Sequence, residues 1–546
     1  MKKFVSVFLC LIMIINLGCV AFAQSSYDID YVVADTANYI YKTVNEPQVG
    51  SIGGEWAVLG LARSGVEIPD EYYQTYYKNV EEYVKEHQGN LHDKKYTEYS
   101  RLIVALTSIG KNPADVAGYN LLTPLGDYEK TIWQGMNGPI WALIALDSGN
   151  YEMPKNPDAT VQATREMYIQ RILDCQLPDG GWSLFGGTKA ATSGDGISDP
   201  DITGMALQAL AKYQDNEKVK SAIDTALNTM SQKQDDKGGF SSWGTSNSES
   251  CVQVLVALCE LGIPYNDNRF VKNGYTILDN LLTYYDKGNG FSHTADGSGV
   301  NLMSTEQAFY GLVAVKRQTN GKSSLYRMDD AILISTSKDN TIGLKNKHAD
   351  VKKMSITAIG KTFSDISDHN SKDAVEALAS RNIINGKTED KFEPDSTMTR
   401  AEFATIITKA LGLPIKSTAV FADVKEADWY FTYVNTAYSY GIIKGVSESE
   451  FNPNGTITRE EAAVMVTRAA KLCGVNTDIQ SFEARNILSQ FLDYIKASDW
   501  SQTSLAFCYR EGVLSDDVLD IKPKEFVTRA EIADMLYNVL RIAELI

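Results

Sequence analysis

The sequence predicts a mainly α-helical protein that combines two repeat architectures. Over residues 27–320, amphipathic helical patterns alternate with more apolar ones, which is typical of helices packed in two layers. Over residues 363–543, three units carry the same short motifs in the same order, which indicates one small module used three times. The chain has 546 residues and is 44% hydrophobic, so it is long enough and apolar enough for several buried cores.

Residues 1–23 are typical of a cleaved secretory leader. Two lysines precede an apolar run that ends in Ala21-Phe22-Ala23, a small-residue pattern that favours cleavage. A membrane anchor is an alternative, although the run is short. A lipoprotein anchor at Cys19 is another, although Asn16 stands where an aliphatic residue is needed. No other stretch is long and apolar enough to span a bilayer, so no transmembrane segment is predicted after cleavage.

The chain is strongly acidic. Loss of the two leader lysines from a formal charge of −17 leaves −19. Such a surface repels nucleic acid, so no nucleic-acid partner is expected, and it suits a secreted protein. The five remaining cysteines are sparse, odd in number and mostly within apolar helical patterns, which predicts buried free thiols.

Six pairs of helical patterns follow one another in the first region. In each pair a polar-faced outer pattern precedes an apolar inner one, and most inner patterns end in glycine, the usual left-handed cap. The outer patterns are 27–44, 70–87, 113–129, 159–175, 216–233 and 268–285, and the inner ones are 55–65, 100–110, 138–149, 202–213, 250–262 and 305–317. Six helical hairpins in series can close into an α6/α6 toroid with an apolar inner ring.

Glycine-aromatic turns precede some of the inner patterns. Residues 176–182 and 234–240 both read Q-x3-G-x-[WF], and residues 288–291 form a related turn. These turns resemble the repeat of the prenyltransferase and squalene-cyclase (terpenoid cyclase) superfamily over about residues 50–318. The resemblance implies an α/α toroid in which the glutamine ties a helix end to the next loop. It also implies a packing role for Trp182.

Catalytic motifs of that superfamily are matched only in part. Its class II cyclases use D-x-D-D-T-A, whose middle Asp is protonated. The run Asp199-Pro200-Asp201-Ile202 is similar, but Ile202 replaces the third Asp. Asp199 and Asp201 are catalytic candidates on this ground, and equally good capping residues. A prenyltransferase zinc site would need a histidine at the start of the last inner helix, where Thr305 stands, so neither a metal nor a cofactor is predicted.

Acidic residues recur at the starts of inner helices and could converge on one mouth. The mouth candidates are Glu55, Asp201, Glu249 and Glu306, together with Trp182 among the aromatics. Paired carboxylates at a toroid mouth would suit sugar cleavage. The alternative is that each acid is simply placed well beside a helix N-terminus. Five tryptophans could line the cavity or pack it: Trp56, Trp133, Trp141, Trp182 and Trp243.

After a polar stretch at 321–362, predicted as a linker, three repeats occupy residues 363–414, 421–475 and 491–543. Each has an Asp turn, a helix, a second turn and a T-R-x-E motif that opens another helix. The Thr and the Glu three residues later predict a capping box. The Arg at the first helical position predicts an outward-reaching anion site, because a helix N-terminus and a guanidinium both favour anions.

These motifs resemble the S-layer homology (SLH) domain in triplicate. The resemblance implies a pseudo-three-fold helical unit that binds pyruvylated secondary cell-wall polysaccharide non-covalently. The residues it places at the sugar pockets are Asp365, Gly386, Arg400, Asp423, Trp429, Gly445, Arg459, Asp493, Trp500 and Arg529. Repeat one lacks the Trp near Ser371, and repeat three has Ser515 in place of the Gly. One or two pockets are therefore expected to be degenerate, and repeats one and two are favoured.

The sequence thus predicts a secreted protein of a Gram-positive-type cell wall or S-layer. Its toroid is expected to bind a small apolar molecule or a glycan. Two other readings stay open. The toroid could be a surface enzyme, either a cyclase-like lyase or a glycan-active one. It could also be a purely structural S-layer component without a ligand.

Overall fold

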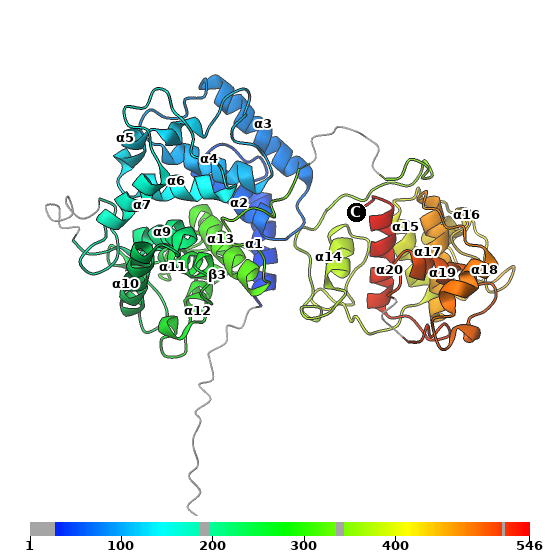
Figure 1. Cartoon of the computed structure of the whole chain (residues 1–546). Coiled ribbons are helices and arrows are strands. Elements are labelled where there is room, and N and C mark those ends of the chain that lie inside the picture. The colour runs from blue at the N-terminus through cyan, green and yellow to red at the C-terminus, as the bar shows by residue number, and fades with distance from the viewer. Residues whose placement is uncertain (1–27, 186–195, 335–342, 516–518) are drawn as a thin grey trace, which may run out of the picture.

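The computed structural model describes residues 28–185, 196–334, 343–515 and 519–546. The predicted leader at 1–23 lies outside these ranges. Two helical bodies follow each other along the chain, the first carrying α1 to α13 and the second α14 to α20 (Figure 1). The mainly α prediction is confirmed. The described strands form two short hairpins, β1 (Ser241–Ser242) with β2 (Thr245–Ser246) and β3 (Tyr285–Asp286) with β4 (Gly290–Phe291).

The first body is a closed ring of six apolar inner helices. They are α2 (Trp56–Arg63), α4 (Thr97–Ser108), α6 (Asn137–Ser148), α9 (Pro200–Leu210), α11 (Ser248–Glu260) and α13 (Leu302–Thr319). Each inner helix packs against the next, and α13 returns to α2. Every residue of α11 is buried, because α9, α12 and α13 all pack against it. The predicted α6/α6 toroid is confirmed.

Six outer helices surround the ring. They are α1 (Ile29–Thr43), α3 (Asp70–Glu86), α5 (Tyr128–Thr131), α7 (Arg165–Asp174), α10 (Glu217–Lys233) and α12 (Ile277–Leu281). The segment η1 (Ser51–Glu55) is a loop, because residues 52–54 have non-helical dihedral angles. The 3-10 turns of the toroid are η2 (Thr123–Gly126), η3 (Ile132–Gln134), η4 (Ala211–Tyr213), η5 (Asn268–Phe270) and η6 (Leu282–Tyr284).

Two outer helices are much shorter than predicted. The range 113–129 is mostly loop, with positive φ at Ala117 and Gly118, before the short α5. The range 268–285 is broken by a tight turn with positive φ at Asn273 and Gly274. A left-handed pair of residues ends a helix whatever the polarity pattern on either side.

The glutamine-glycine turns are structural, as the sequence predicted. Gln176 Nε2 donates to the carbonyls of Gly180 at 2.7 Å and Ala222 at 2.9 Å. Gln234 makes the equivalent pair of bonds within the next hairpin. Trp182 is fully buried, and its indole nitrogen donates to a backbone carbonyl of α7. These turns therefore fasten each loop to a neighbouring outer helix or loop.

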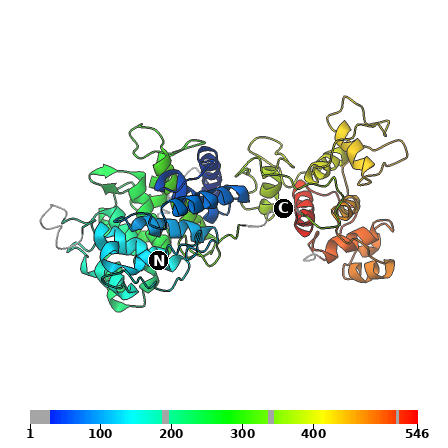
Figure 2. The same cartoon turned by 90° about the horizontal axis from the view of Figure 1, so that it is seen from above.

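The toroid also receives part of the predicted linker and one of the repeats. Arg63 Nη1 pairs with Asp330 Oδ1 at 2.5 Å, so residues 324–334 pack across the end of the toroid where α2 and α13 finish. At the same end Arg381 of repeat one pairs with Glu67, with Nη1 to Oε2 at 2.7 Å. The repeat that carries α14 therefore lies beside the toroid, and the other two lie farther away (Figure 2).

The second body is a ring of three repeats. Its helices are α14 (Lys372–Ser380), α15 (Arg400–Ala410), α16 (Phe431–Ser439), α17 (Arg459–Leu472), α18 (Ser481–Leu488), α19 (Gln502–Arg510) and α20 (Arg529–Ile542), with the 3-10 turn η7 (Tyr494–Lys496). The second helix of each repeat packs on the first helix of the next: α15 on α16, α17 on α19, and α20 on α14. Three β-bridges close the centre, Thr399 with Thr456, Thr458 with Phe526, and Thr397 with Thr528.

The five cysteines of the described chain are buried thiols, as predicted. Within the described residues, no helix is both long enough and apolar enough to cross a membrane.

Candidate functional site

Each T-R-x-E motif forms the predicted capping box. In repeat one, Thr399 N donates to Glu402 Oε2 at 2.8 Å, and Glu402 N donates to Thr399 Oγ1 at 3.2 Å. The pairs at 458/461 and 528/531 form the same box. Two backbone amides at each helix start are thereby satisfied within the motif.

The motif arginines point inward, so the predicted outward reach is wrong. Arg400 is only 6% exposed and stretches from repeat one into repeat two. Its Nε donates to the Phe451 carbonyl at 3.0 Å, and its Nη1 pairs with Glu461 Oε1 at 2.7 Å. The guanidinium also stacks on the Phe451 ring. The motif therefore both starts a helix and links two repeats.

The other two arginines continue this pattern around the ring. Arg459 of repeat two pairs with Glu531 of repeat three. Arg529 of repeat three reaches repeat one, where its Nε donates to the Phe392 carbonyl at 2.9 Å and its Nη2 donates to the Asn385 carbonyl at 2.7 Å. Arg529 has no direct carboxylate partner among the described contacts. Glu402, the capping-box carboxylate of repeat one, pairs with Lys387 instead.

The Asp turns prepare the carbonyls that these arginines use. Asp365 accepts hydrogen bonds from the backbone amides of Phe392 and Glu393, both at 2.8 Å. Asp423 and Asp493 accept the corresponding pair in repeats two and three. The Asp of each repeat therefore holds the loop whose carbonyl receives an Arg from the preceding repeat in the ring.

Gly386 and Gly445 are needed for a close backbone approach. A Cβ at Gly386 would lie 2.3 Å from the Thr388 carbonyl oxygen, and one at Gly445 would lie 2.3 Å from that of Ser447. Real side chains do not tolerate such contacts. Repeat three has Ser515 at this position.

Trp429 and Trp500 are exposed, at 62% and 57%. Each stands five residues before the equivalent helix position, Val434 or Leu505, and Asn370 occupies that place before Val375 in repeat one. Asn370 lines a cavity of about 850 Å³ together with Arg459 and Ser515. In this cavity the loop of one repeat lies beside the Arg of the repeat before it and the Trp position of the repeat after it. We call each such combination a groove. The Arg of one repeat thus contacts the loop of the next repeat and not its own Gly loop, and the preference for repeats one and two stays a prediction.

A second cavity, of about 520 Å³, opens at the N-terminal ends of the inner helices of the toroid. Its wall carries the aromatic rings of Trp56, Trp141, Trp243 and Tyr310 beside several side-chain amides. The Trp56 and Trp141 rings lie 5.2 Å apart. No lysine or arginine is found among the described residues that line it. This cavity is called the mouth below.

The two aspartates at the start of α9 have different roles. Asp199 caps the helix, accepting from Asp201 N at 2.9 Å and Ile202 N at 3.2 Å. Asp201 lines the mouth, and its Oδ1 is buried without a hydrogen-bond partner among the described residues. Burial and the neighbouring Asp199 raise the pKa of Asp201 to about 6. Asp199 is therefore structural, and Asp201 is the carboxyl group that faces the cavity.

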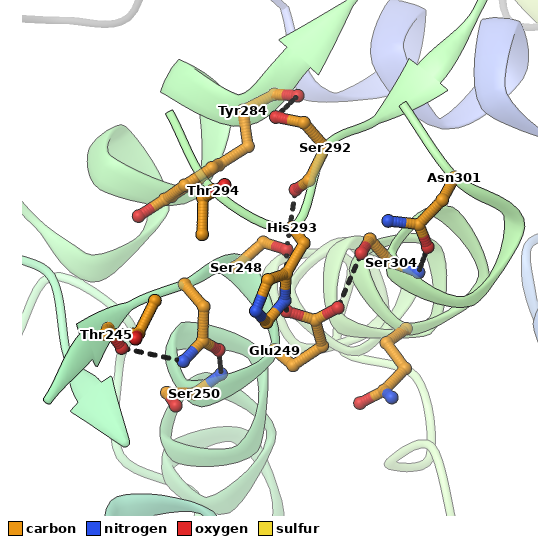
Figure 3. Close-up of polar contacts among 12 residues, drawn as sticks. Thr245, Ser248, Glu249, Ser250, Tyr284, Ser292, His293, Thr294, Asn301 and Ser304 are labelled. Atoms are coloured by element: carbon orange, nitrogen blue, oxygen red, sulfur yellow. Dashed lines mark hydrogen bonds and ion pairs between the residues drawn. The ribbon is translucent and has the colours of Figure 1, made fainter. Parts of the chain in front are cut away.

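Glu249 lies at the centre of a polar cluster in the mouth (Figure 3). Its Oε2 lies 2.7 Å from His293 Nδ1, and Ser304 Oγ donates to its Oε1 at 2.5 Å. Ser248 Oγ is a further donor at 3.1 Å. His293 was not among the site residues predicted from the sequence. Its one signal was its place just after the Gly290-Phe291 turn.

The other two predicted acids do not line the mouth. Glu55 is fully buried, where it accepts the Gly50 amide at 3.0 Å and pairs with Arg101 Nε at 2.9 Å. Glu306 is fully buried and accepts the Gly53 amide at 2.9 Å. Burial raises the pKa of Glu306 to about 8. Both carboxyl groups therefore hold the loop of η1 beneath the mouth.

Two of the predicted tryptophans also lie away from the mouth. Trp182 is buried in the core, and Trp133 is 59% exposed outside the lining. Among the described residues, no three metal-ligating side chains are grouped to hold an ion.

Comparison with known proteins identifies the C-terminal body. A family model for the S-layer homology domain matches residues 362–404, 420–463 and 490–533. The C-terminal body is therefore a triplet of S-layer homology domains, as the motifs predicted. The match does not extend to the toroid.

Curated relatives match about a third of the chain. "Exoglucanase XynX" of Acetivibrio thermocellus is 36% identical over 208 residues, 38% of this chain and 18% of the relative. "Surface-layer 125 kDa protein" of Lysinibacillus sphaericus is 33% identical over 175 residues, 31% of this chain and 14% of the relative. The chain thus spans less than a fifth of the length of each. The domain triplet and these relatives support a location at the cell wall or S-layer.

Solved structures similar to the chain include the unsaturated glucuronyl hydrolase of Bacillus sp. GL1. It is 12% identical with a TM-score of 0.37, over 55% of this chain and 98% of that one. The ent-copalyl diphosphate synthase of Streptomyces platensis is 16% identical with a TM-score of 0.31, over 48% of this chain and 49% of that one. Likeness at this level says nothing about activity.

Proposed function

We propose that the S-layer homology triplet anchors this protein non-covalently to a pyruvylated secondary cell-wall polysaccharide through two of its three grooves. The leader at 1–23 would direct secretion. The observation that carries the proposal is that both departures from the repeat pattern fall on the same groove. Asn370 replaces the Trp and Ser515 replaces the Gly in the cavity that also contains Arg459.

The other two grooves follow from the internal repetition. The groove between repeats one and two combines the Gly386 loop, Arg529 and Trp429. The groove between repeats two and three combines the Gly445 loop, Arg400 and Trp500. Each then offers a guanidinium for a carboxylate and an exposed indole face for a sugar ring, the combination that a pyruvylated sugar needs.

Charge favours the groove between repeats one and two. Arg400 and Arg459 are each paired directly with a carboxylate. Arg529 is bonded to carbonyls only, and Lys387 pairs with Glu402 at 2.8 Å nearby. A ligand carboxylate can therefore bind Arg529 without displacing a protein carboxylate.

The test is binding of the full chain to purified wall sacculi, with Trp429→Ala, Trp500→Ala and the matched control Asn370→Ala. Loss of one stacking face is expected to weaken binding about tenfold, or ~1.4 kcal/mol. We expect the largest loss for Trp429→Ala, a smaller one for Trp500→Ala and none for Asn370→Ala. Binding that survives chemical removal of pyruvate, or an equal loss in all three variants, contradicts the proposal.

The toroid is proposed to present a binding site for a neutral glycan. The mouth has two indole rings tilted against each other, amide side chains and two carboxyl groups, which suit hydroxyl-rich rings. The carboxyl groups of the mouth would repel the diphosphate of an isoprenoid. No lysine or arginine among the described lining residues would bind it. An open cavity of this size also disfavours a purely structural toroid. The mouth lies at the opposite end of the inner helices from the contact with repeat one, so the anchor would leave it accessible.

Titration of the full chain with neutral, N-acetylated and anionic oligosaccharides tests this second proposal. Trp243 is 86% exposed at the mouth, whereas Trp133 is exposed elsewhere and serves as a matched control. Trp243→Ala should abolish binding of a neutral glycan, and Trp133→Ala should leave it unchanged. Tight binding of an isoprenoid diphosphate and of no glycan would instead support the cyclase-like alternative.

A further inference from the structure

We propose that the mouth of the toroid is a hydrolytic acid–base site for a glycosidic bond, with His293 as the general base and Asp201 as the general acid. The inference rests on the proposed glycan-binding role of the mouth and adds a reaction to it. It assigns His293, which no motif singled out, to the chemistry.

The geometry of His293 prepares one ring nitrogen as a base. Its Nδ1 lies 2.7 Å from Glu249 Oε2 (Figure 3), and an ionised carboxylate can only accept, so Nδ1 carries the proton. Nε2 of the neutral ring then keeps its lone pair. Nε2 has no hydrogen-bond partner among the described residues, and the side chain is 44% exposed at the mouth. A water molecule in the mouth can therefore be deprotonated there.

Glu249 is a positioning residue for this base. Ser304 and Ser248 donate to its two oxygens at 2.5 Å and 3.1 Å, so the carboxylate is held from α11 and α13 at once. Ser304 is fixed in turn at the start of α13, where Asn301 caps the helix. Such support fixes both the tautomer and the orientation of the imidazole ring.

Asp201 has the properties of an acid. It lies on α9 across the same cavity, and one carboxyl oxygen is buried without a partner among the described residues. The ionisable groups around it are Asp199, Glu249, Cys251, His293 and Tyr310. None of these is a fixed cation, and burial with Asp199 raises the pKa of Asp201 to about 6. The protonated form that an acid needs is thus populated at mildly acidic pH.

The proposed step balances as a hydrolysis. Asp201 gives its proton to the glycosidic oxygen as the bond from the anomeric carbon to that oxygen breaks. The oxygen of water bonds to the anomeric carbon, and the proton of that water passes to His293 Nε2. Glu249 stabilises the resulting imidazolium, and proton exchange with solvent restores both groups. Because water attacks directly, the product should have inverted anomeric configuration.

The experiment uses the full chain and the neutral glycan that binds best in the titration, with new reducing ends as the readout. Asp201→Asn and His293→Ala should each lower kcat by about 10²-fold or more, the usual contribution of a general acid or base. Glu249→Gln should lower kcat with little change in KM, as expected for a positioning residue. Activity of the wild type should fall as pH rises above about 6, because Asp201 then loses its proton.

Glu306→Gln is the matched control, because Glu306 is also a carboxyl group near the start of an inner helix but does not line the mouth. It should keep full activity. Binding of the same glycan by each variant shows that the mouth is folded. A bound glycan that yields no reducing ends, or one that yields the retained anomer, overturns the acid–base inference and leaves the binding role standing. If no glycan binds, both proposals fail.

Discussion

The toroid and the domain triplet are both closed rings, but they close with different chemistry. The toroid closes by packing apolar helices, with α13 against α2. The triplet closes with polar contacts as well, because an arginine from each repeat enters the next one. In the triplet the proposed ligand-binding arginines are therefore part of the closure. In the toroid, Asp201 and His293 lie in a mouth that the closure does not use. Function and stability should be coupled in the triplet and separable in the toroid.

The largest effect is expected for Arg400→Ala in the triplet. The change leaves the Phe451 carbonyl and Glu461 without their buried partner. Loss of one member of a buried pair costs about 3 kcal/mol. Chemical denaturation of the full chain should show that the free energy of unfolding of the triplet is lowered by that amount. Trp429→Ala, at an exposed position, should stay within about 0.5 kcal/mol of the wild type. Equal stability of the two variants would contradict the coupling.

An intermediate effect is expected for Gln234→Ala in the toroid. Gln234 is 7% exposed and its amide serves the carbonyls of Gly238 and Phe270. Loss of these bonds should lower the free energy of unfolding by about 1–3 kcal/mol. Glycan binding at 25 °C should be retained, because the turn lies outside the mouth lining. A loss of binding that accompanies the loss of stability would show that the two properties are coupled in the toroid as well.

A pH-dependent effect is expected at Glu306. Its folded pKa, about 8, lies above the ordinary value of 4.5, so the folded state binds the proton more tightly than the unfolded state does. This contribution to stability is complete below pH 4.5 and is lost as pH rises through about 8. Glu306→Gln should therefore reduce the loss of thermal stability of the toroid between pH 5 and pH 9. An unchanged slope in calorimetry would show that Glu306 is not the group responsible.

A second pH-dependent effect, smaller than that at Glu306 because the pKa shift is smaller, is expected for Asp201→Asn. The pKa of Asp201 is raised from 3.8 to about 6, so the group favours folding below pH 3.8 and this contribution is lost by about pH 6. At pH 7 the variant should be more stable than the wild type, and at pH 4 the two should be nearly equal. Thermal unfolding at the two pH values measures this. A stability gain with lost turnover is the expected signature of a functional carboxyl group.

Much of the architecture could be predicted because its signals are local. The alternation of outer and inner helices, the capping box of Thr399 and Glu402, and the role of Gln176 all depend on residues a few positions apart. The predictions of two outer helices, at 113–129 and 268–285, were wrong in length, because both ranges contain left-handed turns that a polarity pattern does not show. The site was predicted less well, because His293 and Glu249 come from different segments that only folding brings together.

The sequence by itself determined that this chain has a helical toroid and three S-layer homology repeats, since periodicity and motif order are properties of the chain alone. Only the tertiary structure decided which repeat supplies which part of a groove. It paired Arg529 with the Gly386 loop, and it placed Asn370 and Ser515 together. It also separated Asp201 and Glu249, which face the mouth, from Glu55 and Glu306, which do not. The physical reason is that ring closure and burial are set by contacts between distant segments, and these have no signature at any fixed spacing along the chain.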